Sequence, residues 1–193
     1  MINPAIKDMV RFAVSKLEAG EIIAYPTDTL YGFGVDATNT EAIQKVNQYK
    51  GRTQPMSVIL NNVDSISEFA EINKTQKTEI RKLFPGPYTV LLKKKSSVLS
   101  ELITLESTKI AIRIPNHTFP LEIVKRLKKP IITTSINRHG DEPLNDVSQV
   151  AIDFPDTYIF EEEKFHSSKG STIIDLTENK YKVIRIGDGK YPL

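Results

Sequence analysis

Short apolar runs that alternate with amphipathic helical patterns constrain the fold of this chain more than any other feature of its sequence. Runs typical of buried strands lie at residues 22–25, 57–60, 88–92, 110–114, 131–134, 158–160, 172–176 and 183–186. Helical patterns are predicted at 5–19, 38–49, 64–72, 76–84 and 118–128. Gly20 is expected to cap the end of the first helix, and a capping box from Thr38 to Glu41 to open the second. Because some strands follow one another with no helix between them, the sequence predicts an α/β fold of the α+β type, a twisted mixed sheet flanked by helices.

The length and composition favour one ordinary globular domain over residues 1–193. The chain contains no repeat and no Gly/Ser linker. It has no cysteine, which excludes a disulfide scaffold, a cysteine-ligated zinc site and a thiolate nucleophile. No stretch approaches the roughly 20 apolar residues that cross a bilayer, so no membrane association is expected. The N-terminus lacks the pattern of a signal peptide, which makes the cytoplasm the expected compartment.

The net charge of +2 hides an uneven distribution along the chain. Residues 1–140 carry 20 Lys and Arg against 13 Asp and Glu, whereas residues 141–193 carry 6 against 11. A basic first part is compatible with a phosphate-bearing ligand or a nucleic acid. Scattered lysines on solvated helix faces explain the same excess, so charge alone does not decide between these readings.

The segment after the first predicted strand, residues 25–34, combines two threonines with an acid and two glycines. Gly32 and Gly34 would let the backbone approach a small polar ligand closely, and hydroxyls such as that of Thr27 would recognise the ligand by hydrogen bonds. The alternative is a turn that ends a strand with ordinary hydroxyl and Asx caps. No third glycine follows at the spacing of a dinucleotide fingerprint.

Two basic features could hold an anion. Lys50-Gly51-Arg52 forms a basic corner after a predicted helix, where a guanidinium could grip a phosphate or carboxylate. Cations placed against the helix dipole are the simpler explanation. Arg113 lies between isoleucines on a predicted central strand and needs a partner, either an anionic ligand or an acidic side chain in a buried ion pair.

Hydroxyls, an amide and a further arginine follow other predicted strands. Residues 130–137 end an apolar run with Thr133, Ser135 and Asn137, and residues 170–175 and 183–187 place Ser171 and Arg185 in similar settings. The same hydroxyls could simply satisfy backbone groups. The three histidines show no metal-ligand spacing, so no metal held by protein side chains is expected. Hydroxyls together with cations suit the binding of an anionic nucleotide better than acid–base hydrolysis.

Six segments in order along the chain resemble the YrdC/TsaC-like family of L-threonylcarbamoyl-AMP synthases, in its short single-domain form. The resemblance runs from about residue 10 to 187. The segments are Pro26-Thr27-Asp28-Thr29-Leu30-Tyr31-Gly32-Phe33-Gly34, Lys50-Gly51-Arg52, Pro85-Gly86-Pro87-Tyr88-Thr89, Arg113-Ile114-Pro115, Ser135-Ile136-Asn137 and Gly170-Ser171-Thr172.

This resemblance implies a sheet curving around a large, positively charged cavity, and a nucleotidyltransferase reaction. L-threonine, bicarbonate and ATP would give threonylcarbamoyl-AMP and pyrophosphate, with Mg²⁺ carried by the ATP, no protein metal ligand and no organic cofactor. The product would pass to a tRNA-threonylcarbamoyl transferase complex, and weak binding of tRNA or double-stranded RNA is possible. The implied roles are catalytic for Lys50, Arg52, Ser135 and Asn137, threonine or carbamate binding for Thr27, Arg113, Thr133 and Ser171, and nucleotide binding for Lys50, Ser135, Asn137 and Arg185.

Some residues depart from the family pattern. Thr53 replaces a common proline, Ile136 replaces an alanine, and His139 replaces a serine.

Two other functions compete with the synthase. One alternative is a module that binds double-stranded RNA, although the chain lacks the interleaved aromatics of single-strand readers and known RNA-binding motifs. The other is a paralogue that keeps the nucleotide cavity for different chemistry.

Overall fold

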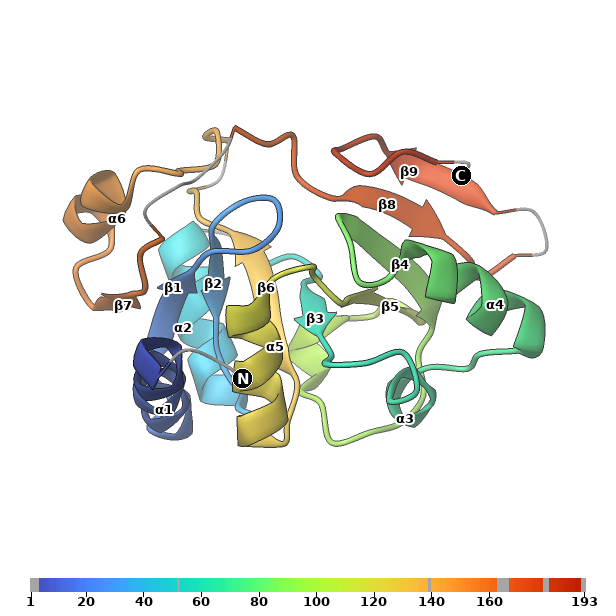
Figure 1. The fold of residues 1–193 in the computed structure, drawn as a ribbon, viewed down its shortest axis with the longest axis horizontal. Helices are drawn as coiled ribbons and strands as arrows, with labels where there is room; N and C mark the ends of the chain where they lie inside the picture. Colours follow the sequence, from blue (N-terminus) through green and yellow to red (C-terminus); the bar gives the residue numbers. More distant parts are fainter. Residues whose placement is uncertain (1–3, 52, 139, 163–166, 179–180, 192–193) are drawn as a thin grey trace.

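The computed structural model describes residues 4–51, 53–138, 140–162, 167–178 and 181–191, which build one nine-stranded sheet. The sheet runs across the whole molecule in the order β7-β1-β2-β6-β3-β5-β4-β8-β9 (Figure 1). The strands are β1 (Ile22–Tyr25), β2 (Gly32–Gly34), β3 (Ser57–Ile59), β4 (Tyr88–Lys93), β5 (Lys109–Arg113), β6 (Ile131–Ser135), β7 (Thr157–Ile159), β8 (Thr172–Asp175) and β9 (Lys182–Arg185).

The pairing of these strands is mixed, as the sequence predicts. Parallel pairs join β1 to β7, β3 to β5 and β4 to β8. The other neighbours run antiparallel. Parallel strands need long crossover connections, whereas antiparallel ones need only turns. The alternation of helices with directly adjoining strands in the sequence therefore leads to this sheet.

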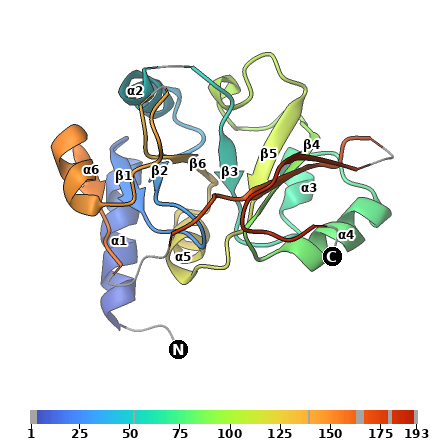
Figure 2. The same cartoon turned by 90° about the horizontal axis from the view of Figure 1, so that it is seen from above.

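Helices cover both faces of the sheet. Figure 2 shows α2 on one side and α1 with α5 on the other. Strand β1 illustrates why both faces are apolar, because Ile22 and Ala24 pack into the cluster that includes α2, whereas Ile23 and Tyr25 pack against α1 and α5. The helices are α1 (Pro4–Glu18), α2 (Thr40–Lys50), α3 (Ile66–Phe69), α4 (Lys74–Leu83), α5 (Thr118–Leu127) and α6 (Val147–Asp153), with a 3-10 turn, η1, at Glu101–Ile103.

Several predicted boundaries need correction. Gly20 does adopt a left-handed φ of 73° after α1, but α2 begins from Asn39, whose side chain accepts from the amide of Ala42. The hydroxyl of Thr38 instead donates to Asp36, so the predicted capping box does not form. The helix predicted at 64–72 is only α3, and α6 and η1 were not predicted because such short elements lack a clear apolar period.

The largest local difference is β2, which the sequence analysis treats as part of a turn. Gly34 lies opposite Ile23, and a Cβ atom at this position would lie 2.6 Å from Cε1 of Tyr25. At Gly32, a Cβ atom would lie 3.0 Å from Oγ1 of Thr133 on β6. The two glycines therefore make room for side chains of neighbouring strands.

Gly34→Ala is expected to lower the free energy of unfolding by about 1–3 kcal/mol, because the new methyl group overpacks the ring of Tyr25. Urea unfolding of Gly34→Ala, Tyr25→Leu and the double variant measures this effect. The smaller leucine should relieve the clash, so the double variant loses less stability than the two single changes added together. Strict additivity would show that Gly34 and Tyr25 do not compete for space.

The Tyr25 phenol provides a prediction for alkaline pH. Burial raises the pKa of Tyr25 to about 12, against the opposing effects of a hydrogen bond with Thr133 and the charge of Arg113. The folded state therefore disfavours the phenolate. The contribution of the neutral phenol to the free energy of unfolding is fully present below pH 10 and is lost as the pH rises toward 12. Two pKa units correspond to about 2–3 kcal/mol.

The measurement is the difference in unfolding free energy between wild type and Tyr25→Phe from pH 9 to pH 11.5. Phenylalanine keeps the ring and removes the titrating proton. We expect wild type to lose stability relative to Tyr25→Phe as the pH rises above 10. A constant difference over the whole range would contradict the shifted pKa.

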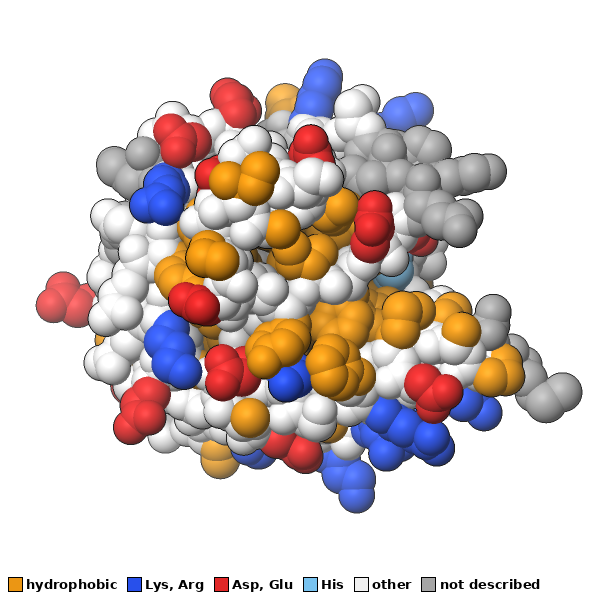
Figure 3. All heavy atoms as spheres, turned by 90° about the vertical axis from the view of Figure 1, so that its left-hand side faces the viewer, with side chains coloured by type: hydrophobic (Ala, Val, Ile, Leu, Met, Phe, Trp, Pro, Cys, Tyr) orange, Lys and Arg blue, Asp and Glu red, His pale blue; other side chains and the backbone are white. Residues whose placement is uncertain are grey.

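The edge of the sheet at β7 carries exposed apolar side chains. Figure 3 shows such side chains gathered on this face of the molecule, and the exposed ones near α1, α6 and β7 are Met9, Phe12, Ile152 and Tyr158. Lys16 lies over the ring of Tyr158, with Nζ 4.0 Å from its centroid. None of the helices that the structure describes is both long and apolar enough to span a bilayer.

Candidate functional site

A cavity of about 360 Å³ opens over the middle of the sheet, where several strands contribute polar side chains. Five of the predicted site residues line it together: Arg113, Thr133, Ser135, Ser171 and Arg185. They come from β5, β6, β9 and the residue directly before β8, which are separate segments of the chain. Further lining residues include Thr29, Gly32, Gln54, Ser57, Thr89, Thr134 and Lys169.

Arg113 is the buried cation of this cavity. Its Nη2 donates to Oδ1 of Asp28 at 3.0 Å and to Oγ1 of Thr29 at 2.9 Å, and the side chains of Arg113 and Asp28 are each 9% exposed. The structure thus confirms the buried ion pair that the sequence left open as one partner of Arg113. Burial lowers the pKa of Arg113, whereas the charge of Asp28 opposes this shift. Nε of Arg113 is buried and has no hydrogen-bond partner among the described residues.

Arg185 brings a second guanidinium to the same cavity. Its Nη2 donates to the backbone oxygen of Ser171 at 2.8 Å and lies 3.2 Å from the Ser171 hydroxyl. Burial lowers the pKa of Arg185, and the nearby charge of Arg113 lowers it further. Two like charges that repel each other across a polar cavity favour an anion between them. Lys169 adds a third cation to the lining.

Hydroxyl groups complete the polar lining. The Ser171 and Thr89 hydroxyls are 2.7 Å apart, and Thr89 is buried on β4. Thr133 and Ser135 lie two residues apart on β6 and therefore share one face of that strand. Hydroxyls can both donate and accept, so they suit the oxygen atoms of a carboxylate, a carbamate or a ribose.

Lys50 is buried beside the cavity, at the end of α2. Its Nζ donates to the backbone oxygen of Ser135 at 2.6 Å and to Oδ1 of Asn137 at 2.8 Å. The Ser135 hydroxyl also donates to Oδ1 of Asn137 at 2.8 Å. The structure therefore brings together the three residues Lys50, Ser135 and Asn137 that the resemblance associates with the nucleotide. In this arrangement the ammonium group holds the loop that follows β6.

Besides Lys50 and Asn137, which are bonded to each other next to the cavity, two further predicted site residues are not found in its lining. Thr27 is buried and donates from Oγ1 to the backbone oxygen of Leu30 at 2.7 Å, while accepting from the amide of Thr29. Its hydroxyl therefore stabilises the turn, which is the alternative that the sequence analysis kept open. Arg52 lies outside the described residues, as does His139. Ile136 is fully buried in the core, where an isoleucine adds apolar contact.

Three residues of this region are not among the predicted site residues. Asp28 and Thr29 hold Arg113, and Lys169 lines the cavity. Asp28 and Arg113 are 85 residues apart, so no local pattern could pair them. The signals for Asp28 and Thr29 are a polar turn directly after a buried strand and their place in the first family-like segment. No group of three or more histidine and acidic side chains that could hold a metal occurs among the residues placed in the structure.

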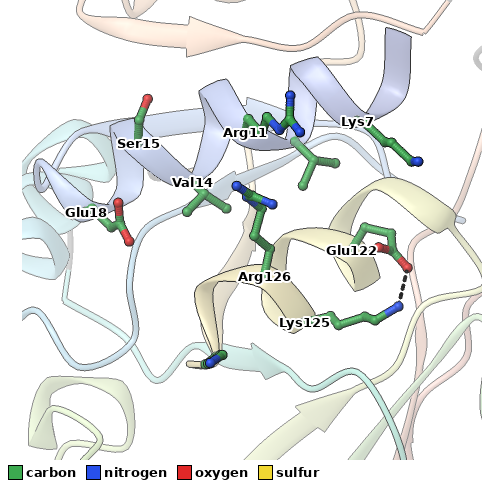
Figure 4. A pocket seen from close by; sticks show the side chains of 10 residues that line it. Lys7, Arg11, Val14, Ser15, Glu18, Glu122, Lys125 and Arg126 are labelled. Atoms are coloured by element: carbon green, nitrogen blue, oxygen red, sulfur yellow. Dashed lines mark hydrogen bonds and ion pairs between the residues drawn. The ribbon is translucent and has the colours of Figure 1, made fainter. Parts of the chain in front are cut away.

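Among the wider hollows elsewhere on the molecule, two lie beside α1 and α5. The groove between α1 and α5, of about 820 Å³, is lined by Lys7, Arg11, Lys125, Arg126 and Lys128 (Figure 4). Within it Lys125 pairs with Glu122, and Arg11 pairs with Asp8, which is not part of the lining. A second hollow, of about 790 Å³, lies at the N-terminal ends of α1 and α5. Neither combines a buried arginine with convergent hydroxyls, so the cavity over the sheet, with Arg113, is the better candidate for a small anionic ligand.

Comparison with known proteins relates this cavity to a family. The sequence model of the Sua5/YciO/YrdC family, described as "Telomere recombination", matches residues 15–187. A putative threonylcarbamoyl-AMP synthase of Methanocaldococcus jannaschii is 32% identical over 192 residues, which cover 97% of this chain and 88% of that protein. The threonylcarbamoyl-AMP synthase of Bacillus subtilis is 32% identical over 145 residues, which cover 73% of this chain and 42% of that protein.

A solved structure supports the same relationship. Sua5 of Pyrococcus abyssi complexed with L-threonine superposes with a TM-score of 0.84 at 29% identity. The match covers 92% of this chain and 54% of that chain, so the present chain spans about half the length of the Pyrococcus protein. Since the family model covers most of the sequence and a relative above 30% identity matches nearly all of it, this chain belongs to the Sua5/YciO/YrdC family.

Proposed function

We propose that this chain is an L-threonylcarbamoyl-AMP synthase and that the cavity over the sheet is its active site. The observation that carries the proposal is the pair of guanidiniums, Arg113 and Arg185, in a cavity lined with hydroxyls within a chain of this family. The amine of L-threonine would combine with bicarbonate to form a carbamate and water. A carbamate oxygen would then attack the α-phosphorus of MgATP, and pyrophosphate would leave.

The reaction brings two anions together, so positive charge matters more than a general base. Arg113 would bind the carboxylate of threonine, and the hydroxyls of Thr133 and Ser171 would orient the carbamate. Arg185 would face the nucleotide and offset the charge that develops at phosphorus. Mg²⁺ would arrive with the triphosphate as part of the substrate.

The loop held by Lys50 would bind the nucleotide through Ser135 and Asn137. Lys50 would then act in two ways, by fixing this loop and by adding positive charge near the phosphates. The catalytic role of Arg52 rests on the family resemblance, and Thr27 would support the threonine subsite through its turn. The product would serve a tRNA-threonylcarbamoyl transferase in the cytoplasm.

The test is release of pyrophosphate from ATP by the purified chain. We expect release only when ATP, Mg²⁺, L-threonine and bicarbonate are all present, because the carbamate must form before phosphorus is attacked. The product should have the mass of threonylcarbamoyl-AMP and should take up one ¹³C atom from labelled bicarbonate. Equal turnover without threonine would contradict the synthase and favour a paralogue with different nucleotide chemistry.

Binding of double-stranded RNA is a second candidate function, and the basic groove between α1 and α5 favours it (Figure 4). If the small cavity is the functional site, ATP should raise the melting temperature by mass action. RNA should then bind only weakly, with the steep salt dependence of phosphate contacts. Tight RNA binding at physiological salt without any response to ATP would reverse this ranking.

A further inference from the structure

Asp28 occupies a buried position beside the cavity and uses both of its carboxylate oxygens. Oδ1 accepts from Nη2 of Arg113 at 3.0 Å, and Oδ2 accepts from the backbone amide of Asn116 at 2.9 Å. The carboxylate thereby links the turn between β1 and β2 to the end of β5 and to the loop before α5. No described basic side chain other than Arg113 lies within ion-pair distance of Asp28.

These contacts fix how Arg113 presents its donors. Nη2 carries two hydrogens, and Asp28 and Thr29 accept both of them. Nε remains buried and has no partner among the residues that the structure describes, on a side chain that is 9% exposed and lines the cavity. A buried donor without a partner costs about 1–3 kcal/mol, so a bound oxygen atom at this place would be stabilising.

The charge of the Asp28 carboxylate also helps to keep the guanidinium of Arg113 in place. Arg113 and Arg185 repel each other, and the carboxylate of Asp28 is the acid that balances Arg113. Without this carboxylate, a buried guanidinium would have a strong tendency to move toward solvent or to change rotamer. The side chain of Asp28 thus keeps a cation in place where a second cation opposes it.

We infer that Asp28 is a positioning residue, which holds the guanidinium of Arg113 in the orientation that binds the carboxylate of the amino-acid substrate. This inference rests on the proposed function, since the substrate carboxylate is that of L-threonine. Asp28 itself touches the turn, Arg113 and the loop at Asn116. It acts on the substrate through Arg113 alone, and this distinguishes it from a residue that would bind the substrate amine directly.

The experiment measures KM and kcat for Asp28→Asn, Arg113→Ala and the double variant. Asp28→Asn is expected to raise KM for L-threonine at least tenfold, while KM for ATP changes less than twofold. In the Arg113→Ala background, the same substitution should raise KM for threonine no further. Asp36→Asn is the matched control, because Asp36 is a buried acid that pairs with Lys129 and accepts from a backbone amide away from the cavity.

Three results would overturn the inference. One is a KM for threonine within twofold of wild type in Asp28→Asn. Another is an undiminished rise in KM in the Arg113→Ala background, which would mean that Asp28 binds the substrate itself. The third is an equal rise in Asp36→Asn, which would reflect a general loss of structure. If Asp28→Asn does not fold, Thr29→Val removes the second acceptor of Nη2 and is expected to raise KM for threonine at least threefold, again only when Arg113 is present.

The proposed function and the role of Asp28 can fail separately. If wild type releases no pyrophosphate, the synthase reaction is contradicted. Calorimetric binding of L-threonine then decides the role of Asp28, and the Kd is expected to rise at least tenfold in Asp28→Asn. Wild-type protein that binds no threonine, or an unchanged Kd in the variant, would overturn that role.

Discussion

Lys50→Met is expected to lower turnover roughly a hundredfold and the free energy of unfolding by about 2–3 kcal/mol. Methionine keeps the buried apolar stem but removes the ammonium group that bonds to the backbone oxygen of Ser135 and to Oδ1 of Asn137. These two oxygen atoms then lose their charge-assisted hydrogen bonds. The loop after β6 would then shift, and displacements of about 1 Å can cost a hundredfold in rate.

Turnover and urea unfolding of Lys50→Met and Lys45→Met test this expectation. Lys45 lies five residues earlier in α2 and donates to a single backbone oxygen, that of Gly20, so its replacement should leave turnover within twofold of wild type. If Lys50→Met kept most of its activity while losing stability, Lys50 would serve the fold only. Lys50 would then not belong to the nucleotide site.

Arg113→Ala is expected to lower kcat/KM for threonine at least about a hundredfold, because it removes the cation that would bind the carboxylate. It is also expected to destabilise the fold by about 3–5 kcal/mol, since Asp28 would remain as a buried carboxylate without its partner. Arg113→Lys should restore part of the stability but little of the activity. An ammonium group cannot bond to Asp28 and Thr29 and still present a planar fork to the substrate.

Kinetics of Arg113→Ala and Arg113→Lys have to be measured at a temperature where circular dichroism shows both variants folded. Under those conditions the loss of activity reports on substrate binding and not on the folded fraction. A lysine variant with near wild-type kcat/KM would show that charge alone suffices. An alanine variant with near wild-type kcat/KM would remove Arg113 from the site.

The sequence predicts most of this fold because apolar runs mark strands that are buried on both faces. All of the predicted strands occur, with ends that move by no more than one residue. Strand β2 is not predicted because two of its three residues are glycines, which carry no apolar pattern. Glycines stand at these positions because the side chains of Tyr25 and Thr133 need the space. Packing between neighbouring strands determines whether such a segment forms a strand, and the sequence of one strand alone does not reveal this packing.

The site is predictable to the extent that its polar residues follow strands. Thr133, Ser135 and Ser171 were found this way, and the family resemblance added their roles. The partner of Arg113 could not be found, because the contact with Asp28 depends on how the β1–β2 turn folds back over the end of β5. Thr27 differs, since its hydroxyl donates within the turn itself, and its contact with threonine stays a prediction.

The central claim, that the cavity over the sheet binds the substrates, can be tested by nuclear magnetic resonance on ¹⁵N-labelled protein. The chain has seven arginines, so their side-chain Nε resonances can be assigned by single substitutions. On titration with L-threonine and a non-hydrolysable ATP analogue, we expect the Nε resonances of Arg113 and Arg185 to shift, while those of Arg11 and Arg126 stay unchanged. Shifts confined to Arg11 and Arg126 would place the ligand in the groove between α1 and α5 and would contradict the account.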